Sequence, residues 1–313
     1  MKQSLLILSC AVALVGCATS SKQCTCNKPA AADWQLAVQA WTFNKMTFFD
    51  AVDTTAKLGM HYIEAFPGQK IGGGIDAKMV PDMEPAVREK VLARLKSAGV
   101  TLVNFGVTGA GDEAGWVKLF DFAKAMGIQT IVAEPQTNQF ALLDKLTQQY
   151  GINIALHNHP DPSRYWNPET VLKATAGCNP RIGACADTGH WVRSGLDPVA
   201  CLQKLQGHII SLHFKDLNEF ARSGHDVVWG TGVSNVPGML AELRRQGFTG
   251  VFSAEYEHTT PELQANVGAC GVAFAKFATM SECDLRHLGT SKDIKAVHQH
   301  ATTGDAGKWT VQP

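Results

Sequence analysis

Five side chains that can bind a metal or move a proton each stand where a short apolar segment ends. They are Glu134, His157, Asp187, His213 and Glu255. Three carboxylates and two imidazoles confined together would repel one another or shift their pKa values unless a cation neutralised them. Their oxygen and nitrogen atoms suit Mn, Mg, Co or Zn. The sequence therefore predicts a divalent metal site, provided that the fold brings the five together.

The elements that must position these residues alternate regularly from residue 36 onward. Short β-rich segments are followed by amphipathic segments of roughly ten to fifteen residues. Eight such units predict a (β/α)8 TIM barrel over residues 34–280. An open, doubly wound sheet is the competing fold, but no G-x-G-x-x-G follows the first strand. The expected strands are Leu36–Phe43, Tyr62–Phe66, Thr101–Val107, Thr130–Glu134, Asn153–His157, Ile182–Asp187, Ile209–Phe214 and Val251–Tyr256.

Alternation along these strands predicts which side chains enter the barrel. Successive side chains of a barrel strand point to the lumen and to the helices. In the segment INIALHNHPD, Ile154 and Leu156 form an apolar set, whereas His157 and His159 belong to the other set. The same alternation puts further ionisable residues on the lumen side at the carboxyl ends of their strands: Glu134, Asp187, His213, Lys215, Glu255 and Glu257.

Short motifs around these residues resemble a known family. They are Glu134-Pro135, His157-Asn158-His159, Asp187-Thr188-Gly189-His190, His213-Phe214-Lys215-Asp216 and Glu255-Tyr256-Glu257. Together they are similar to the sugar phosphate isomerase/epimerase family, the xylose isomerase-like TIM barrels, over residues 36–278. Within that family, DTGHW, HFKD and the GTG loop most resemble exported members that are lyases or hydratases of 3-keto-sugars or 3-keto-glycosides.

The resemblance implies roles for individual residues. It implies that a divalent metal is held by Glu134, Asp187, His213 and Glu255. It also implies that His190, three residues beyond the metal-binding Asp187, contacts the substrate.

Metal chemistry of this kind needs a base beside the metal. A bound cation can polarise a carbonyl and stabilise the enediolate that forms when the neighbouring C–H loses its proton. The enediolate is reprotonated in an isomerase or epimerase and expels a β-oxygen in a lyase. The histidine pair is favoured because imidazole titrates near neutrality, and Lys215 could instead orient His213. Candidate catalytic residues are His157, His159, Glu64 and Lys215, with Glu257 as a further candidate.

The predicted substrate is a small, neutral carbohydrate. Aromatic rings near the barrel mouth could stack on sugar faces, and Arg164 and Arg193 are the few arginines there that could bind a phosphate. A keto-sugar or keto-glycoside is therefore favoured over a sugar phosphate. The predicted substrate-binding residues are His190, Trp41, Trp191, Trp229 and Glu257.

Two other functions compete with a sugar-processing enzyme, and the charge of the chain bears on the first of them. The chain has 28 Lys+Arg and 28 Asp+Glu, so it lacks the basic excess of nucleic-acid-binding proteins. This argues against a metal-dependent phosphodiesterase or endonuclease-like barrel and predicts no nucleic-acid partner. A lipid-anchored sugar-binding protein without turnover is the other alternative. The sequence leaves the oligomeric state open.

The chain ends carry a different kind of signal. Residues 1–17 resemble a lipoprotein signal peptide whose Leu14-Val15-Gly16-Cys17 looks like a lipobox, which predicts lipidation of Cys17. Residues 18–33 would form a flexible tether and residues 281–313 a C-terminal tail. We expect an exported protein held in the bacterial cell envelope by its lipid alone. Export would permit one disulfide, for which Cys270 and Cys283 are candidates.

Overall fold

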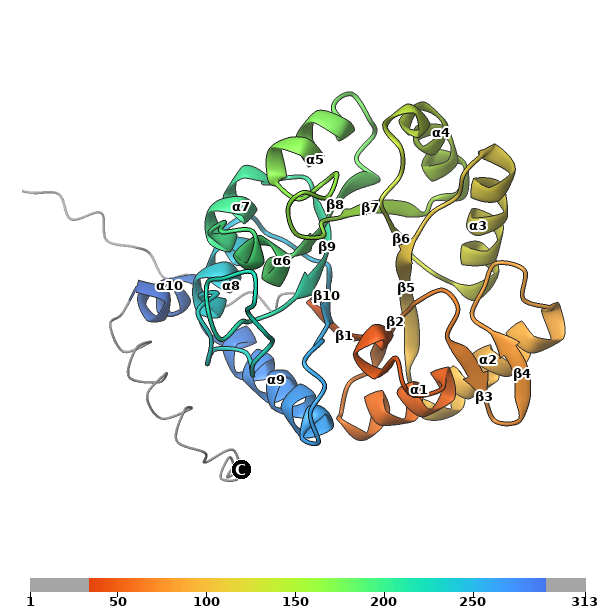
Figure 1. Cartoon of the computed structure of the whole chain (residues 1–313), viewed down its shortest axis with the longest axis horizontal. Coiled ribbons are helices and arrows are strands. Elements are labelled where there is room, and N and C mark those ends of the chain that lie inside the picture. Colours follow the sequence, from red (N-terminus) through yellow and green to blue (C-terminus); the bar gives the residue numbers. More distant parts are fainter. Residues whose placement is uncertain (1–33, 291–313) are drawn as a thin grey trace, which may run out of the picture.

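Eight parallel strands close into a barrel that is surrounded by helices (Figure 1). The computed structural model describes residues 34–290. Around the barrel the strands follow the order β1-β10-β9-β8-β7-β6-β5-β2, and β1 pairs with β10 to close it. The predicted (β/α)8 barrel is confirmed. Its strands are β1 (Gln35–Gln39), β2 (Tyr62–Ala65), β5 (Thr101–Thr108), β6 (Thr130–Ala133), β7 (Asn153–His157), β8 (Ile182–Asp187), β9 (Ile209–Phe214) and β10 (Val251–Ala254).

The helices lie outside the strands, and a small antiparallel hairpin extends the link between β2 and the next helix. The hairpin consists of β3 (Lys70–Gly72) and β4 (Ile75–Lys78). The helices are α1 (Phe48–Lys57), α2 (Pro85–Ala98), α3 (Glu113–Met126), α4 (Phe140–Tyr150), α5 (Pro168–Thr175), α6 (Thr188–Arg193), α7 (Pro198–Lys204), α8 (Val236–Arg245), α9 (Leu263–Ala278) and α10 (Glu282–Thr290), with 3-10 turns at Ala40–Phe43 and Thr137–Gln139.

Side-chain caps start several helices at the rim where the strands end. Asp112 accepts a hydrogen bond from the backbone N–H of Gly115, and Asn167 accepts one from Thr170. Such caps satisfy backbone donors that the helix itself leaves unpaired. At the opposite rim, Gly99 closes α2 in the left-handed conformation, with φ of 66°. That conformation favours glycine and turns the chain directly into the next strand.

The alternation expected from the sequence separates two layers of core. Outward-pointing Leu156, Phe214 and Phe252 are fully buried beneath the helices. Inside the barrel, a separate cluster of small apolar residues includes Ala155 and Cys185. Because these fill the lower lumen, the carboxyl half of the barrel is left to polar side chains.

The first strand is shorter than the sequence pattern predicted. β1 ends at Gln39, and Ala40–Phe43 form a 3-10 turn in place of the last residues of the expected strand. The side-chain carbonyl of Gln39 accepts the backbone N–H of Trp41 at 2.8 Å. This local hydrogen bond turns the chain and carries Trp41 to the mouth of the barrel.

The expected C-terminal tail begins with a helix. α10 packs against α8, and Leu285 on it is fully buried. The thiol of Cys270 is buried and forms no disulfide, so the suggested Cys270–Cys283 pairing is absent. The predicted signal peptide, Cys17 and the tether lie outside the described residues, as does the rest of the tail. Among the helices of residues 34–290, none is both long enough and apolar enough to cross a membrane.

Replacement of Leu285 tests whether α10 belongs to the folded barrel. Leu285→Ala removes a buried side chain and should lower the free energy of unfolding by about 2–4 kcal/mol. Urea denaturation measures this loss, and the exposed His287→Ala on the same helix is the control. A loss no larger than that of the control would show that α10 contributes little to the fold.

Candidate metal centre

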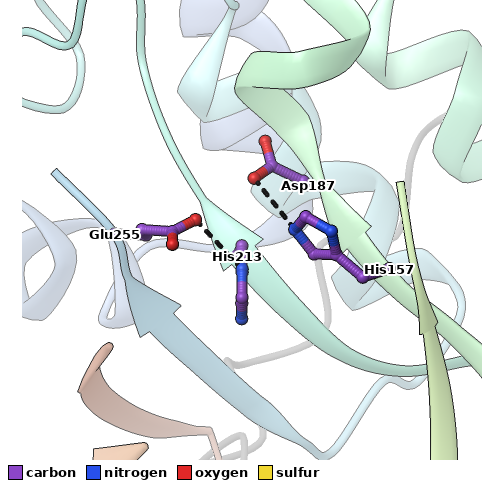
Figure 2. Close-up of side chains that lie close together, drawn as sticks. All are labelled: His157, Asp187, His213 and Glu255. Carbon is purple, nitrogen blue, oxygen red and sulfur yellow. Dashed lines mark ion pairs between the residues drawn. The ribbon is translucent and has the colours of Figure 1, made fainter. Parts of the chain in front are cut away.

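Four of the predicted residues meet inside the carboxyl end of the barrel (Figure 2). His157 ends β7, Asp187 ends β8, His213 lies in β9 and Glu255 directly follows β10. One nitrogen or oxygen atom from each lies within 4.8 Å of the other three. All four residues are buried. Neighbouring strands thus deliver two imidazoles and two carboxylates to a single point.

The ligand atoms of this cluster are short of hydrogen-bond partners. His157 Nε2 lies 3.5 Å from Asp187 Oδ2, and His213 Nδ1 lies 3.0 Å from Glu255 Oε2. Neither imidazole nitrogen has a hydrogen-bond partner of good geometry. Buried polar atoms are costly when left unpaired. A divalent cation would satisfy them all at once, so the residues fit the predicted metal.

Glu64 orients His213 from behind. His213 Nε2 lies 2.8 Å from Glu64 Oε1, and Ser253 Oγ donates to the other carboxylate oxygen at 2.6 Å. The Glu64 carboxylate accepts a hydrogen bond from Nε2–H of His213. Nδ1 of His213 therefore keeps a lone pair that can bind a metal in the cluster. Glu64 is fully buried and does not line the pocket. The structure therefore does not support Glu64 as a base and assigns it to positioning His213.

Glu134 supports the histidine pair. Its Oε1 lies 3.2 Å from Nδ1 of His157 and also hydrogen-bonds Nδ1 of His159. Burial would raise the pKa of Glu134, but these hydrogen bonds outweigh it and lower the pKa to about 2. The resemblance implied Glu134 as the fourth ligand. In the structure His157 completes the four-residue cluster, and Glu134 belongs to an adjoining group with both histidines.

Lys215 is a buried cation that contacts both carboxylates of the cluster. Its buried Nζ lies 2.8 Å from Asp187 Oδ2, 2.8 Å from Glu255 Oε2 and 3.0 Å from Glu257 Oε2. Burial would lower the pKa of Lys215, but the charges of Asp187 and Glu255 outweigh it and hold the pKa well above its usual value. The ammonium therefore stays charged and cannot serve as the base.

A pocket of about 400 Å³ opens above the cluster. Three imidazoles and two carboxylates line it. Trp41 also lines it; this residue is 45% exposed, and its ring meets Phe66 edge to face at 5.1 Å. The lining residues are Gln39, Trp41, Phe66, Pro67, Gly106, Val107, His157, His159, His190, Glu255 and Glu257.

Two of the predicted stacking residues are turned away from this pocket. Trp191 and Trp229 are buried in the hydrophobic core, and Trp229 packs edge to face on Phe214 at 4.9 Å. Asp216 holds the loop that carries Trp229, because its carboxylate accepts the backbone N–H of Gly230 at 2.8 Å. Sugar stacking is therefore not supported for Trp191 or Trp229, whereas Trp41 is placed for it.

The sequence reasoning assigned no role to Arg193 beyond counting it among the rim arginines. Its guanidinium lies 2.6 Å from Glu257 Oε2 and 3.1 Å from His190 Nδ1. The signal was available, because Asp187, His190 and Arg193 are spaced by three residues and share one face of a helical turn. Asn158 was also missed: its side chain accepts the N–H of Asp187 at 2.8 Å and donates to the carbonyl of Asp187 at 2.9 Å.

Comparison with known proteins agrees with this arrangement. Residues 52–269 match the model of the xylose isomerase-like TIM barrel family. The chain belongs to this family, as the motifs indicated. A solved structure of an uncharacterized protein from Parabacteroides distasonis ATCC 8503 is 35% identical and covers 78% of this chain and 99% of its own, with a TM-score of 0.66.

Other relatives have described activities or metals. An inosose dehydratase of Lacticaseibacillus casei is 24% identical over 204 residues, which span 56% of this chain and 65% of that protein, just under two thirds of its length. The probable 3-DHS dehydratase AsbF of Bacillus anthracis is 18% identical, with a TM-score of 0.60 over 77% of this chain and 98% of its own. A Mycobacterium smegmatis barrel of the same kind was solved in complex with magnesium; it is 14% identical, with a TM-score of 0.64 over 82% of this chain and 98% of its own.

A change at Glu64 tests the assigned support of His213. Glu64→Gln keeps the size of the side chain but weakens its hold on the imidazole, so metal affinity should fall by about 10- to 100-fold. Competition with a chromophoric chelator measures this affinity. Glu89→Gln, on the exposed face of α2, is the matched control. An affinity equal to that of the control would remove Glu64 from the metal site.

Proposed function

We propose that this protein is a divalent-metal-dependent enzyme that removes a proton next to the carbonyl of a keto-sugar or 3-keto-glycoside and acts as a lyase or hydratase. One observation carries the proposal. Two buried imidazole nitrogens without hydrogen-bond partners of good geometry converge with two carboxylates beside a pocket that is lined by imidazoles. The inosose dehydratase among the sequence relatives supports the lyase or hydratase type.

The metal would be held by His157, Asp187, His213 and Glu255. When bound, a divalent cation polarises a carbonyl oxygen and stabilises the negative charge that develops when the adjacent carbon is deprotonated. Lys215 stays charged beside Asp187 and Glu255, so its ammonium also favours negative charge in the pocket.

His159 is the proposed base. Its Nδ1 is held by Glu134, so its Nε2 keeps the lone pair needed to accept a proton. The hydrogen bond to Glu134 is the main cause that raises the pKa of His159 above its usual value. The side chain is 50% exposed at the pocket, whereas His157 is 2% exposed and directs its Nε2 into the metal cluster. Exposure and direction thus favour His159 over His157.

Two further pocket residues would hold the sugar. The carboxylate of Glu257 can accept a hydrogen bond from a sugar hydroxyl, because its side chain remains 30% exposed beside its cationic neighbours. Trp41 follows β1, which lies across the barrel from β7, so its indole can offer a flat apolar face opposite the imidazoles that follow β7. A sugar ring with one polar edge and one C–H face matches this division.

Product analysis tests the proposed reaction. The metal-loaded full chain is incubated with a panel of glycosides, their 3-keto forms and keto-inositols, and products are identified by mass spectrometry. We expect β-elimination or hydration of keto substrates, loss of activity with a chelator and recovery on addition of metal. Interconversion of plain aldoses and ketoses alone would contradict the lyase or hydratase reaction. Thermal stabilisation by ligands without product would indicate a binding protein.

Replacement of His159 tests the assignment of the base. His159→Ala should lower kcat by about 10²- to 10⁴-fold, the usual contribution of a positioned general base. Metal content per chain, measured by elemental analysis, should stay unchanged. His61→Ala, at an exposed position before β2, is the control. Full turnover in His159→Ala with metal bound would exclude His159 as the base.

A further inference from the structure

The imidazoles of the pocket differ in what binds their Nδ1 atoms. Nδ1 of His157 and Nδ1 of His159 both meet a carboxylate oxygen of Glu134. Nδ1 of His190 instead lies 3.1 Å from Nη1 of Arg193. One kind of partner accepts hydrogen bonds, whereas the other can only donate them.

This difference decides where each ring carries its proton. A neutral imidazole has one N–H and one lone pair. Because a guanidinium cannot accept a hydrogen bond, Nδ1 of His190 must use its lone pair toward Arg193, and the proton must sit on Nε2. We propose that Arg193 is a positioning residue that fixes His190 in the Nε2–H tautomer, so that His190 donates a hydrogen bond to a substrate oxygen.

Arg193 is anchored well enough to impose this choice. Its side chain is 12% exposed. Nη1 also pairs with Glu257 Oε2 at 2.6 Å, Nη2 lies 3.3 Å from Asp226 Oδ2, and Nε donates to the carbonyl of Gly224 at 3.0 Å. A planar guanidinium held at all three nitrogens cannot rotate away from the imidazole.

His190 is equally fixed and lines the pocket. Its backbone N–H donates to Asp187 Oδ1 at 2.8 Å, which sets the start of α6. Its ring stacks on that of His159, with centroids 5.4 Å apart and planes 30° apart. Its Nε2 lies 3.5 Å from Asp187 Oδ2, so a proton on Nε2 sits where the pocket meets the metal cluster. Two adjacent rings therefore present opposite polarity there, a donor from His190 and an acceptor from His159.

That opposite polarity would orient the substrate. A neutral imidazole can donate the hydrogen bond of its N–H to a carbonyl oxygen and so polarise it. An oxygen of the reacting carbon pair would face His190 while the C–H bond faces His159. This step rests on the proposed function, whereas the tautomer of His190 follows from its contact with Arg193.

Nuclear magnetic resonance measures the tautomer directly. The full chain is labelled with ¹⁵N-histidine and loaded with Mg²⁺, and the ring resonances of His190 are assigned by their loss in His190→Gln. We expect unprotonated Nδ1 and protonated Nε2 in the wild type. Arg193→Met removes the donor and should populate the Nδ1–H tautomer, whereas Arg193→Lys keeps a cationic donor and should retain Nε2–H. Arg181→Met, whose guanidinium contacts the carbonyl of Gly151 at the other rim, is the control.

Two outcomes would overturn the inference. One is a wild-type His190 with its proton on Nδ1, which can be seen even if Arg193→Met fails to fold. The other is a folded Arg193→Met that keeps the wild-type tautomer. In a turnover assay, Arg193→Met should lower kcat by about 100-fold with a smaller change in KM. Because the tautomer is read without substrate, absence of any reaction would reject the proposed function and leave this test intact.

Discussion

Burial of Asp187 and Glu255 is the constraint around which the rest of the site is arranged. Both carboxylates lie at the ends of strands inside the barrel, where burial leaves them little contact with water. Charges in such a place need opposite charge and hydrogen bonds close by. Lys215 supplies one positive charge at 2.8 Å from each carboxylate. His157 Nε2 and His213 Nδ1, which lie beside them without hydrogen-bond partners of good geometry, could bind a cation that supplies the remaining positive charge.

Carboxylates behind His213, His157 and His159 set the direction of these imidazoles. Glu64 holds the far nitrogen of His213, and Glu134 holds those of His157 and His159. A ring nitrogen can bind a metal or accept a proton only if its partner nitrogen carries the hydrogen. The carboxylates behind the imidazoles therefore determine which atoms face the cluster and the pocket, and they do so before any ligand arrives.

The sequence predicted the fold and the convergence of the site because both follow from local periodicity. Alternation along the strand is a backbone property, so the lumen position of His157 and His213 could be read from their neighbours. The ends of β7, β8 and β9 were predicted correctly for the same reason. The end of β1 was not, because a side-chain hydrogen bond of Gln39 overrides the apolar pattern there.

Which residues contact one another within the site could not be predicted from the alternation along the strands. Whether Glu134 or His157 completes the cluster depends on contacts between residues of different strands, which a single sequence does not reveal. The burial of Trp191, in α6, and of Trp229, in the loop after β9, likewise depends on packing between distant segments. The spacing of Arg193 from Asp187 and His190 indicates a shared helical face, but the four groups that contact its guanidinium come from other loops and strands as well and could not be predicted from that spacing.

Crystals of the protein loaded with Mn²⁺ would test the metal centre most directly, because anomalous scattering locates the ion without reference to any assumed ligand. We predict a single strong peak at bonding distance from His157 Nε2, His213 Nδ1 and one oxygen each of Asp187 and Glu255. A peak that leaves His157 Nε2 or His213 Nδ1 without a bond to the metal, including one bound by Glu134 in place of His157, would contradict the assigned centre.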